Sequence, residues 1–217
     1  MKKLLIPILC CLLAVTSCQM INSYQAQNMR DIVTMDQGRL VNDNGVVFNI
    51  VEVGEDVPEL EEGYRYYVLF DILNQNLDIF VKDAVRTKII NAQPVPDNLD
   101  EIEADDPIEV SFYNLGAHYW DIGLYYYDQD RSDFYHTFPV YYGLEDGGQK
   151  LHLYVFHEGD DENPAKMSMD ELVTRFIVIS VPIAEFKDID LYALTCDVLT
   201  QNTPTGEYEV VSHTITK

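Results

Sequence analysis

The sequence is poor in positive charge: 14 lysines and arginines stand against 37 aspartates and glutamates, which gives a formal net charge of −23. A protein with this charge repels phosphate backbones and anionic lipid. The composition therefore argues against a nucleic-acid-binding protein and against membrane attachment through a basic patch. Cationic, neutral or metal-ion partners fit better, although the acidity alone also keeps a protein soluble.

The chain also lacks a hydrophobic run that could cross a bilayer, because a spanning helix takes about 20 apolar residues. The apolar run at 4–15 is shorter, contains a proline and follows Lys2 and Lys3. Small residues come after it. A charged start, a short apolar stretch and a small-residue end are typical of a secretory signal peptide, which we expect to span residues 1–17.

Cysteine is scarce, and its placement predicts a lipid anchor. Of four cysteines, Cys10 and Cys11 lie in the leader, and Cys18 and Cys196 follow it. The tetrapeptide "VTSC" ending at Cys18 resembles the lipobox of bacterial lipoproteins, which implies that Cys18 is acylated and begins the mature chain. Two or more acyl chains give stable membrane attachment. The rival interpretation is a secreted protein with a disulfide at Cys18.

Catalytic signatures are missing as well. The sequence has no Gly-x-Ser-x-Gly, no phosphate-binding glycine loop and no Cys-x-x-Cys. "HEGDD" at 157–161 lacks the second histidine of a zinc protease. His152 and His157 are five apart on an expected strand, so they should face opposite sides, and Cys196 among apolar neighbours should be a buried, inert thiol. We therefore predict no enzyme activity and no cofactor.

Acidic pairs and clusters are weak candidate sites. Glu61-Glu62, Asp105-Asp106 and Asp160-Asp161 fall in turn-like stretches, where adjacent carboxylates are usually solvated. Calcium takes six to eight oxygen ligands, which clusters such as "DQDRSD" and "GDDEN" supply in part. The calcium candidates in the first of these are Asp128, Asp130 and Asp133. Neither cluster has the spacing of an EF-hand, so a polar hairpin remains the simpler interpretation.

What the sequence does contain is a series of short strands. Alternating apolar residues separated by Gly, Pro, Asn and Asp recur along the chain, and Asn44-Gly45 favours a tight hairpin. This pattern predicts an all-β protein with a small barrel followed by a sandwich. We expect a polar tether at 18–35, the barrel at 36–104 and the sandwich at 105–217. The proline-rich, acidic stretch 91–107 supplies the boundary.

Tyrosines are concentrated in the second expected domain. Alternation along strands places only half of them inward, so some rings should face solvent or a partner. Exposed tyrosines stack on sugar rings or anchor protein interfaces, but tyrosine is also a common strand residue. The candidate ligand or partner face consists of Tyr125, Tyr127, Tyr135 and Tyr141.

The layout as a whole resembles the NigD-like lipoproteins of Bacteroidetes. The resemblance rests on the lipobox, the tether, the block "GRLVNDNGVVFNIVEV…YRYYVLFDIL" and the aromatic strand "YWDIGLYYY". It implies an OB-like N-terminal domain, a C-terminal β-sandwich and no established enzyme activity. Acidic residues directly after the lipidated cysteine mark surface-exported lipoproteins in this phylum, and the chain has none at 19–24. We therefore expect an outer-membrane anchor that faces the periplasm.

The predicted function is that of a non-enzymatic lipoprotein that binds an envelope partner, most simply a protein. A glycan-binding accessory protein that uses the tyrosine-rich face is the chief alternative, and an enzyme with a site between its domains is a weaker one. No nucleic-acid partner is expected, because the charge opposes it. Neither the partner nor the oligomeric state can be read from the sequence.

Overall fold

The computed structural model describes residues 25–96, 108–128, 135–159, 173–186, 193–201 and 208–216. Within these ranges the chain is almost entirely β-structure, as the sequence predicted, with two short 3-10 turns. Contacts divide the chain into two compact units, and the division falls between Arg86 and Thr87 in the sequence. None of the residues that the structure describes forms an apolar helix with the length that a membrane crossing requires.

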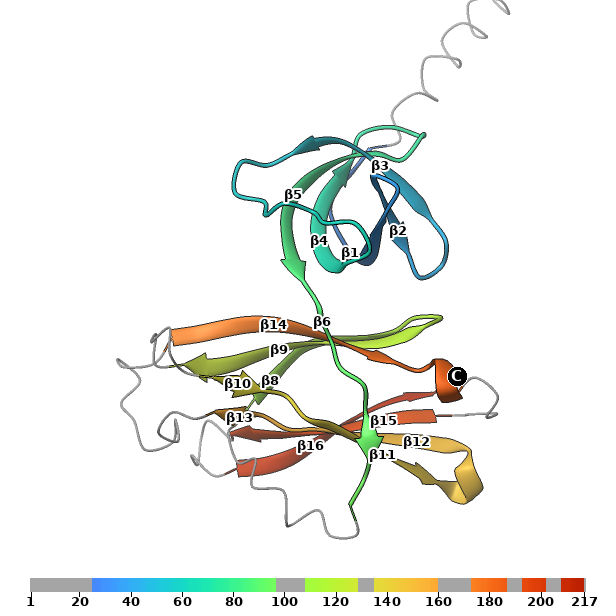
Figure 1. Cartoon of the computed structure of the whole chain (residues 1–217), viewed down its shortest axis with the longest axis vertical. Coiled ribbons are helices and arrows are strands. Elements are labelled where there is room, and N and C mark those ends of the chain that lie inside the picture. The colour runs from blue at the N-terminus through green and yellow to red at the C-terminus, as the bar shows by residue number, and fades with distance from the viewer. Residues whose placement is uncertain are drawn as a thin grey trace, which may run out of the picture. The chain divides into compact units, whose positions relative to one another are not determined.

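The first unit is a closed five-stranded barrel (Figure 1). Its strands are β1 (Ala26–Asp36), β2 (Arg39–Asn42), β3 (Val47–Val53), β4 (Arg65–Ile72) and β5 (Asp78–Arg86). They follow the order β1-β2-β3-β5-β4, and β4 then pairs with β1 to close the ring. β3 and β5 pair in parallel, while the other neighbours are antiparallel. A small five-stranded barrel of this kind is OB-like, as predicted.

Alternating apolar side chains fill the barrel. Val33, Leu40, Val68, Ile79 and Val81 are fully buried, and each lies on a different strand or two apart on one strand. Strand periodicity places such residues on one face, so closing the sheet directs all of them to the same interior. The barrel core therefore follows from the period-2 pattern of the sequence.

The predicted hairpin at Asn42–Gly45 forms between β2 and β3. The Asn42 side chain accepts hydrogen bonds from the backbone N–H groups of Asn44 and Val46, and Gly45 has φ of 78°. An asparagine that bonds its own turn, followed by a glycine at positive φ, is the chemistry that a tight turn requires. Asp43 in the same turn forms a 2.6 Å ion pair with the buried Arg65 of β4.

The second unit is a sandwich of two sheets, as predicted (Figure 1). The first sheet contains, in order, β6 (Lys88–Ile89), β14 (Val173–Pro182), β9 (Tyr119–Asp128) and β8 (Ile108–Leu115). The second sheet contains, in order, β16 (Tyr208–Thr216), β15 (Ala193–Gln201), β12 (Lys150–Val155), β11 (Val140–Glu145) and β7 (Gln93–Pro94). The remaining elements are the short pair β10 (His136–Thr137) and β13 (Glu158–Gly159), and the turns η2 (Asp146–Gly148) and η5 (Ala184–Phe186).

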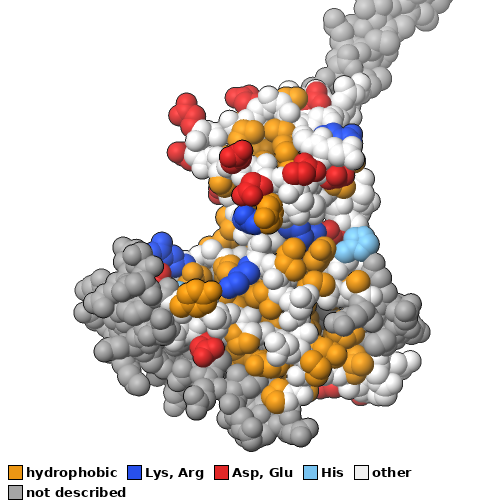
Figure 2. Space-filling model, viewed as in Figure 1, with side chains coloured by type: hydrophobic (Ala, Val, Ile, Leu, Met, Phe, Trp, Pro, Cys, Tyr) orange, Lys and Arg blue, Asp and Glu red, His pale blue; other side chains and the backbone are white. Residues whose placement is uncertain are grey.

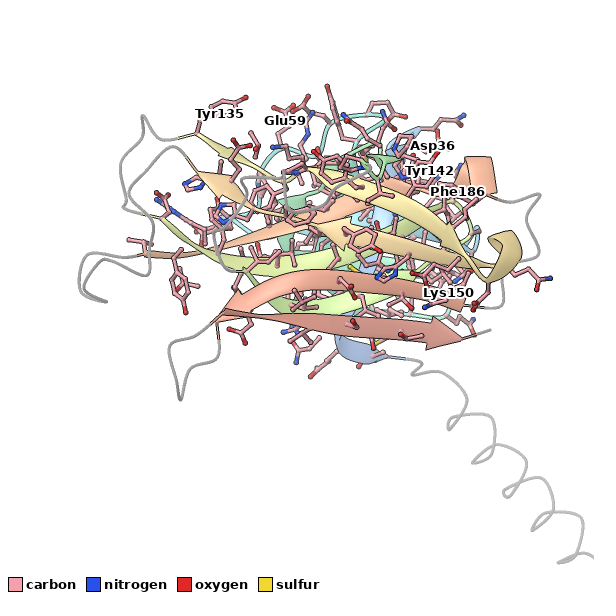
Figure 3. The ribbon with its side chains drawn as sticks, turned by 90° about the horizontal axis from the view of Figure 1, so that it is seen from below. Asp36, Glu59, Tyr135, Tyr142, Lys150 and Phe186 are labelled. Atoms are coloured by element: carbon pink, nitrogen blue, oxygen red, sulfur yellow. The ribbon has the colours of Figure 1, made fainter. Side chains whose placement is uncertain are left out.

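Inward residues of both sheets share one core. Trp120 and Ile122 of β9 and Ile179 of β14 belong to the same buried cluster as Leu151 and Leu153 of β12. At its edge the Tyr142 ring packs edge-on against Phe186 with centroids 4.9 Å apart, and the two side chains lie close together in Figure 3. Outward-facing residues on the same strands are therefore free to form surfaces.

The domain limits differ from those expected at both ends of the barrel. β1 begins at Ala26, so the predicted tether at 18–35 contains most of a barrel strand. At the other end, β6 pairs with β14 and β7 pairs with β11. Residues 87–95 thus belong to the sandwich, although the sequence placed the boundary at 104/105. Long-range strand pairing sets this domain boundary, and the local pattern of prolines and acidic residues does not reveal it.

Candidate functional site

An aromatic row lies on the outer face of the first sheet. Trp120, Ile122 and Leu124 of β9 point into the core, so alternation turns Tyr125 outward. Tyr125 stands opposite Phe176 of β14 and opposite Glu109 of β8 in the strand register. Residues directly opposite on neighbouring strands have Cβ atoms about 5 Å apart. The three side chains therefore form one row across three strands.

Phe112, further along β8, brings a third ring beside this row. Phe112 lies opposite Gly123, and its ring covers that glycine so closely that a Cβ atom there would meet the ring at 2.3 Å. The Phe176 ring lies 5.1 Å from that of Tyr125 and 6.4 Å from that of Phe112, measured between centroids. Tyr125 is 39% exposed. We call Phe112, Tyr125 and Phe176 the aromatic ridge.

The four tyrosines predicted as one face are not on one face. Tyr125 and Tyr127 share the outer face of the first sheet, because both alternate with core residues of β9. Tyr141 alternates with the core residue Tyr142 on β11, so it lies on the outer face of the second sheet, where its ring contacts Phe156. Tyr135 precedes β10 and is 72% exposed at the end of the sandwich (Figure 3).

A buried histidine pair closes the same end of the sandwich. Nδ1 of His136 lies 3.0 Å from Nε2 of His157, and Nε2 of His136 lies 3.4 Å from a carboxylate oxygen of Asp128. The His157 ring is stacked on Phe138 at 4.8 Å, and its buried Nδ1 has no hydrogen-bond partner among the residues that the structure describes. Burial first, and then the nearby His136, lowers the pKa of His157 to about 3. This ring is held neutral.

Asp128, one of the three calcium candidates, belongs to this cluster. Besides His136 it contacts Arg175, whose Nε donates a 3.1 Å hydrogen bond to it. Asp128 therefore serves as the counter-ion of Arg175. Asp130 and Asp133 lie outside the described residues. Sequence reasoning missed the histidine pair, because the partners are 21 residues apart and carry no motif.

His152 lies on the outer face of the second sheet, whereas His157 stacks on the core residue Phe138. β12 ends at Val155, so His157 follows the strand on which the sequence analysis placed it. Nδ1 of His152 is 2.8 Å from Glu145, its Nε2 is 2.9 Å from Asp197, and its ring stacks on Tyr154 at 4.3 Å. Glu145 also accepts a 2.7 Å hydrogen bond from Lys150. Hydrogen bonds from Lys150 and then His152 hold the pKa of Glu145 below its usual range.

This arrangement does not activate a nucleophile. The Ser212 hydroxyl donates to Asp197, and the hydroxyl beside His152 is that of Tyr154, 3.3 Å from Nδ1. Burial, and then the charges of Glu145 and Asp197, raise the pKa of Tyr154, so this phenol stays protonated. Cys196 is fully buried, and burial raises the pKa of its thiol, which confirms the expected inert thiol. Among the residues that the structure describes, no group of three or more His, Cys, Asp or Glu side chains could hold a metal ion.

The barrel surface offers little to a polyanion. Three of its cations are paired with carboxylates: Arg65 with Asp43, Lys82 with Asp71, and Arg86 with Glu61. Figure 2 shows acidic side chains spread over the face of the barrel that is turned to the viewer.

Comparisons with known proteins support the fold. No family model matches the chain, and no curated protein matches it in sequence. Solved structures do match. The chain is similar in fold to a NigD-like immunity protein. That protein comes from Bacteroides caccae. The two structures align with a TM-score of 0.60 and 14% sequence identity, and the alignment covers 89% of this chain and 99% of the other. The resemblance predicted from the sequence is thus confirmed at the level of the fold.

Two further solved structures have the same architecture. A protein of unknown function from Bacteroides vulgatus has a TM-score of 0.58 and 15% identity, covering 87% of this chain and 91% of its own. A protein from Bacteroides fragilis, provisionally assigned as a lipoprotein, has a TM-score of 0.58 and 10% identity, covering 88% and 98%. None of the three descriptions names a catalytic activity.

Proposed function

We propose that this chain is a non-enzymatic lipoprotein, anchored in the outer membrane through Cys18 and facing the periplasm, that binds a protein partner of the cell envelope. The leader and the lipobox of the sequence support the anchor. The fold shared with a protein provisionally assigned as a lipoprotein supports the envelope location. One further observation, the aromatic ridge, carries the binding role.

The ridge has the composition of a protein-binding surface. Tyrosine and phenylalanine bury large areas and are enriched at protein interfaces, where they tend to dominate the binding energy. Tyr125 exposes 39% of its surface, although Leu124 beside it on the inner face of β9 is fully buried. A partner that covers these rings would bury apolar area on a rigid sheet, without the entropic cost of ordering a loop.

The geometry of the rings favours a protein over a glycan. A sugar chain stacks best on rings that share a plane, whereas Phe176 is tilted by 48° to Tyr125 and by 45° to Phe112. Tilted rings form a ridge with faces in several directions, which interdigitating side chains of a protein can fill. A glycan-binding role remains the alternative, and the experiment below distinguishes the two.

The test is site-specific photocrosslinking with the full lipidated chain in its native envelope. A photoreactive phenylalanine analogue replaces Tyr125 in one strain and Tyr141 in a control strain, since Tyr141 faces outward from the opposite sheet. We expect one discrete protein adduct at 125 and none at 141. Absence of a protein adduct at 125, together with glycan-array binding that Tyr125→Ala abolishes, would replace the proposal with the glycan-binding alternative.

A further inference from the structure

Acidic groups outnumber the cations among the described residues of the second unit, and each of these cations is engaged. Among the described residues from 87 onward the only lysines and arginines are Lys88, Lys150 and Arg175. Lys88 Nζ lies 5.6 Å above the Phe138 ring, Lys150 pairs with Glu145, and Arg175 pairs with Asp128. Nine aspartates and glutamates occupy the same ranges. A partner that approaches this unit therefore meets negative charge.

The aromatic ridge combines this charge with an exposed ring. Glu109 is exposed and stands opposite Tyr125 in the strand register. Among the described residues, no ion pair reaches Glu109 and no cation lies over Tyr125. A carboxylate beside an accessible aromatic ring is a combination that attracts a cation on two counts, through the charge and through the negative face of the ring.

The barrel shows what fills such a pair in this protein. There Arg86 lies 3.3 Å above the Tyr64 ring and donates a 3.2 Å hydrogen bond to Glu61. One guanidinium thus satisfies a tyrosine and a glutamate together. On the ridge the tyrosine and the glutamate are both present, and among the described residues the chain supplies no arginine to them.

We propose that the partner presents an arginine-bearing, basic protein segment to the aromatic ridge, with a guanidinium stacked on Tyr125 and paired with Glu109. This inference rests on the proposed protein-binding function and specifies the chemistry of the partner. Arginine suits the site better than lysine, because its planar, weakly hydrated guanidinium stacks on rings and pairs with a carboxylate through two N–H groups.

Peptide binding tests the inference directly. The full lipidated protein in a neutral detergent is titrated with three labelled peptides of equal length, in which glycine alternates with arginine, lysine or glutamate. A stacked guanidinium adds about two- to fivefold in affinity at an exposed site. We therefore expect the arginine peptide to bind about two- to fivefold more tightly than the lysine peptide. The glutamate peptide should not bind.

Single-residue variants show whether the preference for arginine arises at the aromatic ridge. Tyr125→Leu keeps apolar area and removes the aromatic ring, so it should abolish the preference for arginine over lysine. Glu109→Gln should weaken both basic peptides and reduce the dependence of binding on salt. Tyr141→Leu, on the opposite sheet, is the matched control and should leave both affinities unchanged. Equal binding of the arginine and lysine peptides, or a preference that survives Tyr125→Leu, would overturn the inference.

The two proposals fail in different ways. A protein adduct at position 125 without a preference for arginine would keep the proposed function and refute the basic partner. Loss of the adduct at 125 would refute the proposed function. In that case binding of basic peptides that no ridge variant alters would reflect only the net charge of −23, and it would refute the basic partner as well.

Discussion

Acid should destabilise the sandwich through one residue, His157. Its side chain is 1% exposed, stacked on Phe138 and edge-on to Tyr126. Burial and the neighbouring His136 lower its pKa to about 3, while Asp128 opposes this shift. In the unfolded chain the same imidazole takes up a proton near pH 6.5.

The direction of the pH dependence follows from the number of protons that each state binds. Between pH 6.5 and about 3 the unfolded chain binds one proton more than the folded chain at this site, so stability rises with pH in that window. The stability that the neutral His157 ring allows is fully present above pH 6.5 and is lost as the pH falls toward 3. At 1.36 kcal/mol per pKa unit the upper limit is about 5 kcal/mol. This is a large fraction of the stability of a typical domain.

The perturbation is His157→Phe, which keeps a flat ring against Phe138 and removes the titrating group. At neutral pH it should cost about 1–3 kcal/mol, since His136 loses its 3.0 Å partner. The variant should then lose less stability than the wild type as the pH falls from 7 to 4. Most of the stability that the wild type loses through His157 is lost above pH 4. The unfolding free energies of the two proteins should therefore converge, or cross, in acid.

Urea unfolding followed by tryptophan fluorescence measures this effect. The chain has a single tryptophan, and Trp120 is fully buried in the sandwich core, so its emission reports this unit. Unfolding free energies at pH 7, 6, 5 and 4 give the slope for each variant. His118→Gln, at an exposed histidine, is the matched control. Equal losses for the wild type and His157→Phe between pH 7 and 4 would refute the reasoning.

Four further predictions concern the anchor, the barrel, the ridge and nucleic-acid binding. Cys18→Ala should leave an uncleaved precursor without acyl label, and a mature N-terminus at any other residue would disprove the assignment. Arg65→Ala should destabilise the barrel by about 3–5 kcal/mol, because it leaves Asp43 next to the turn without its 2.6 Å partner; urea titration in parallel with an Arg39→Ala control measures this. Gly123→Ala should cost about 1–3 kcal/mol, since the new Cβ meets the Phe112 ring at 2.3 Å, and restoration of stability by Phe112→Ala in the double variant would confirm the clash. Single-stranded DNA or RNA should not bind at physiological salt by fluorescence anisotropy, because the chain carries a net charge of −23, and saturable, strongly salt-dependent binding would contradict this.

The sequence determined the features that depend on local order. Alternation of apolar residues predicted the strands, and through them an all-β barrel followed by a sandwich. Asn44-Gly45 fixed a hairpin, because a glycine at positive φ is a property of the residue itself. Alternation also placed His152 on the outer face of β12, between the buried Leu151 and Leu153, and the apolar neighbours of Cys196 predicted its burial.

Only the tertiary structure decided which strands are neighbours. β6 and β7 joined the sandwich through pairs with β14 and β11, far along the chain, and this moved the division between the units to Arg86–Thr87. The same non-local pairing placed Tyr125 and Tyr141 on opposite sheets and brought Glu109 and Phe176 to either side of Tyr125. It also joined His136 to His157. A period of two reveals which side of a strand a residue occupies, but the partner strand and its register are set by burial of the whole core, which no local pattern contains.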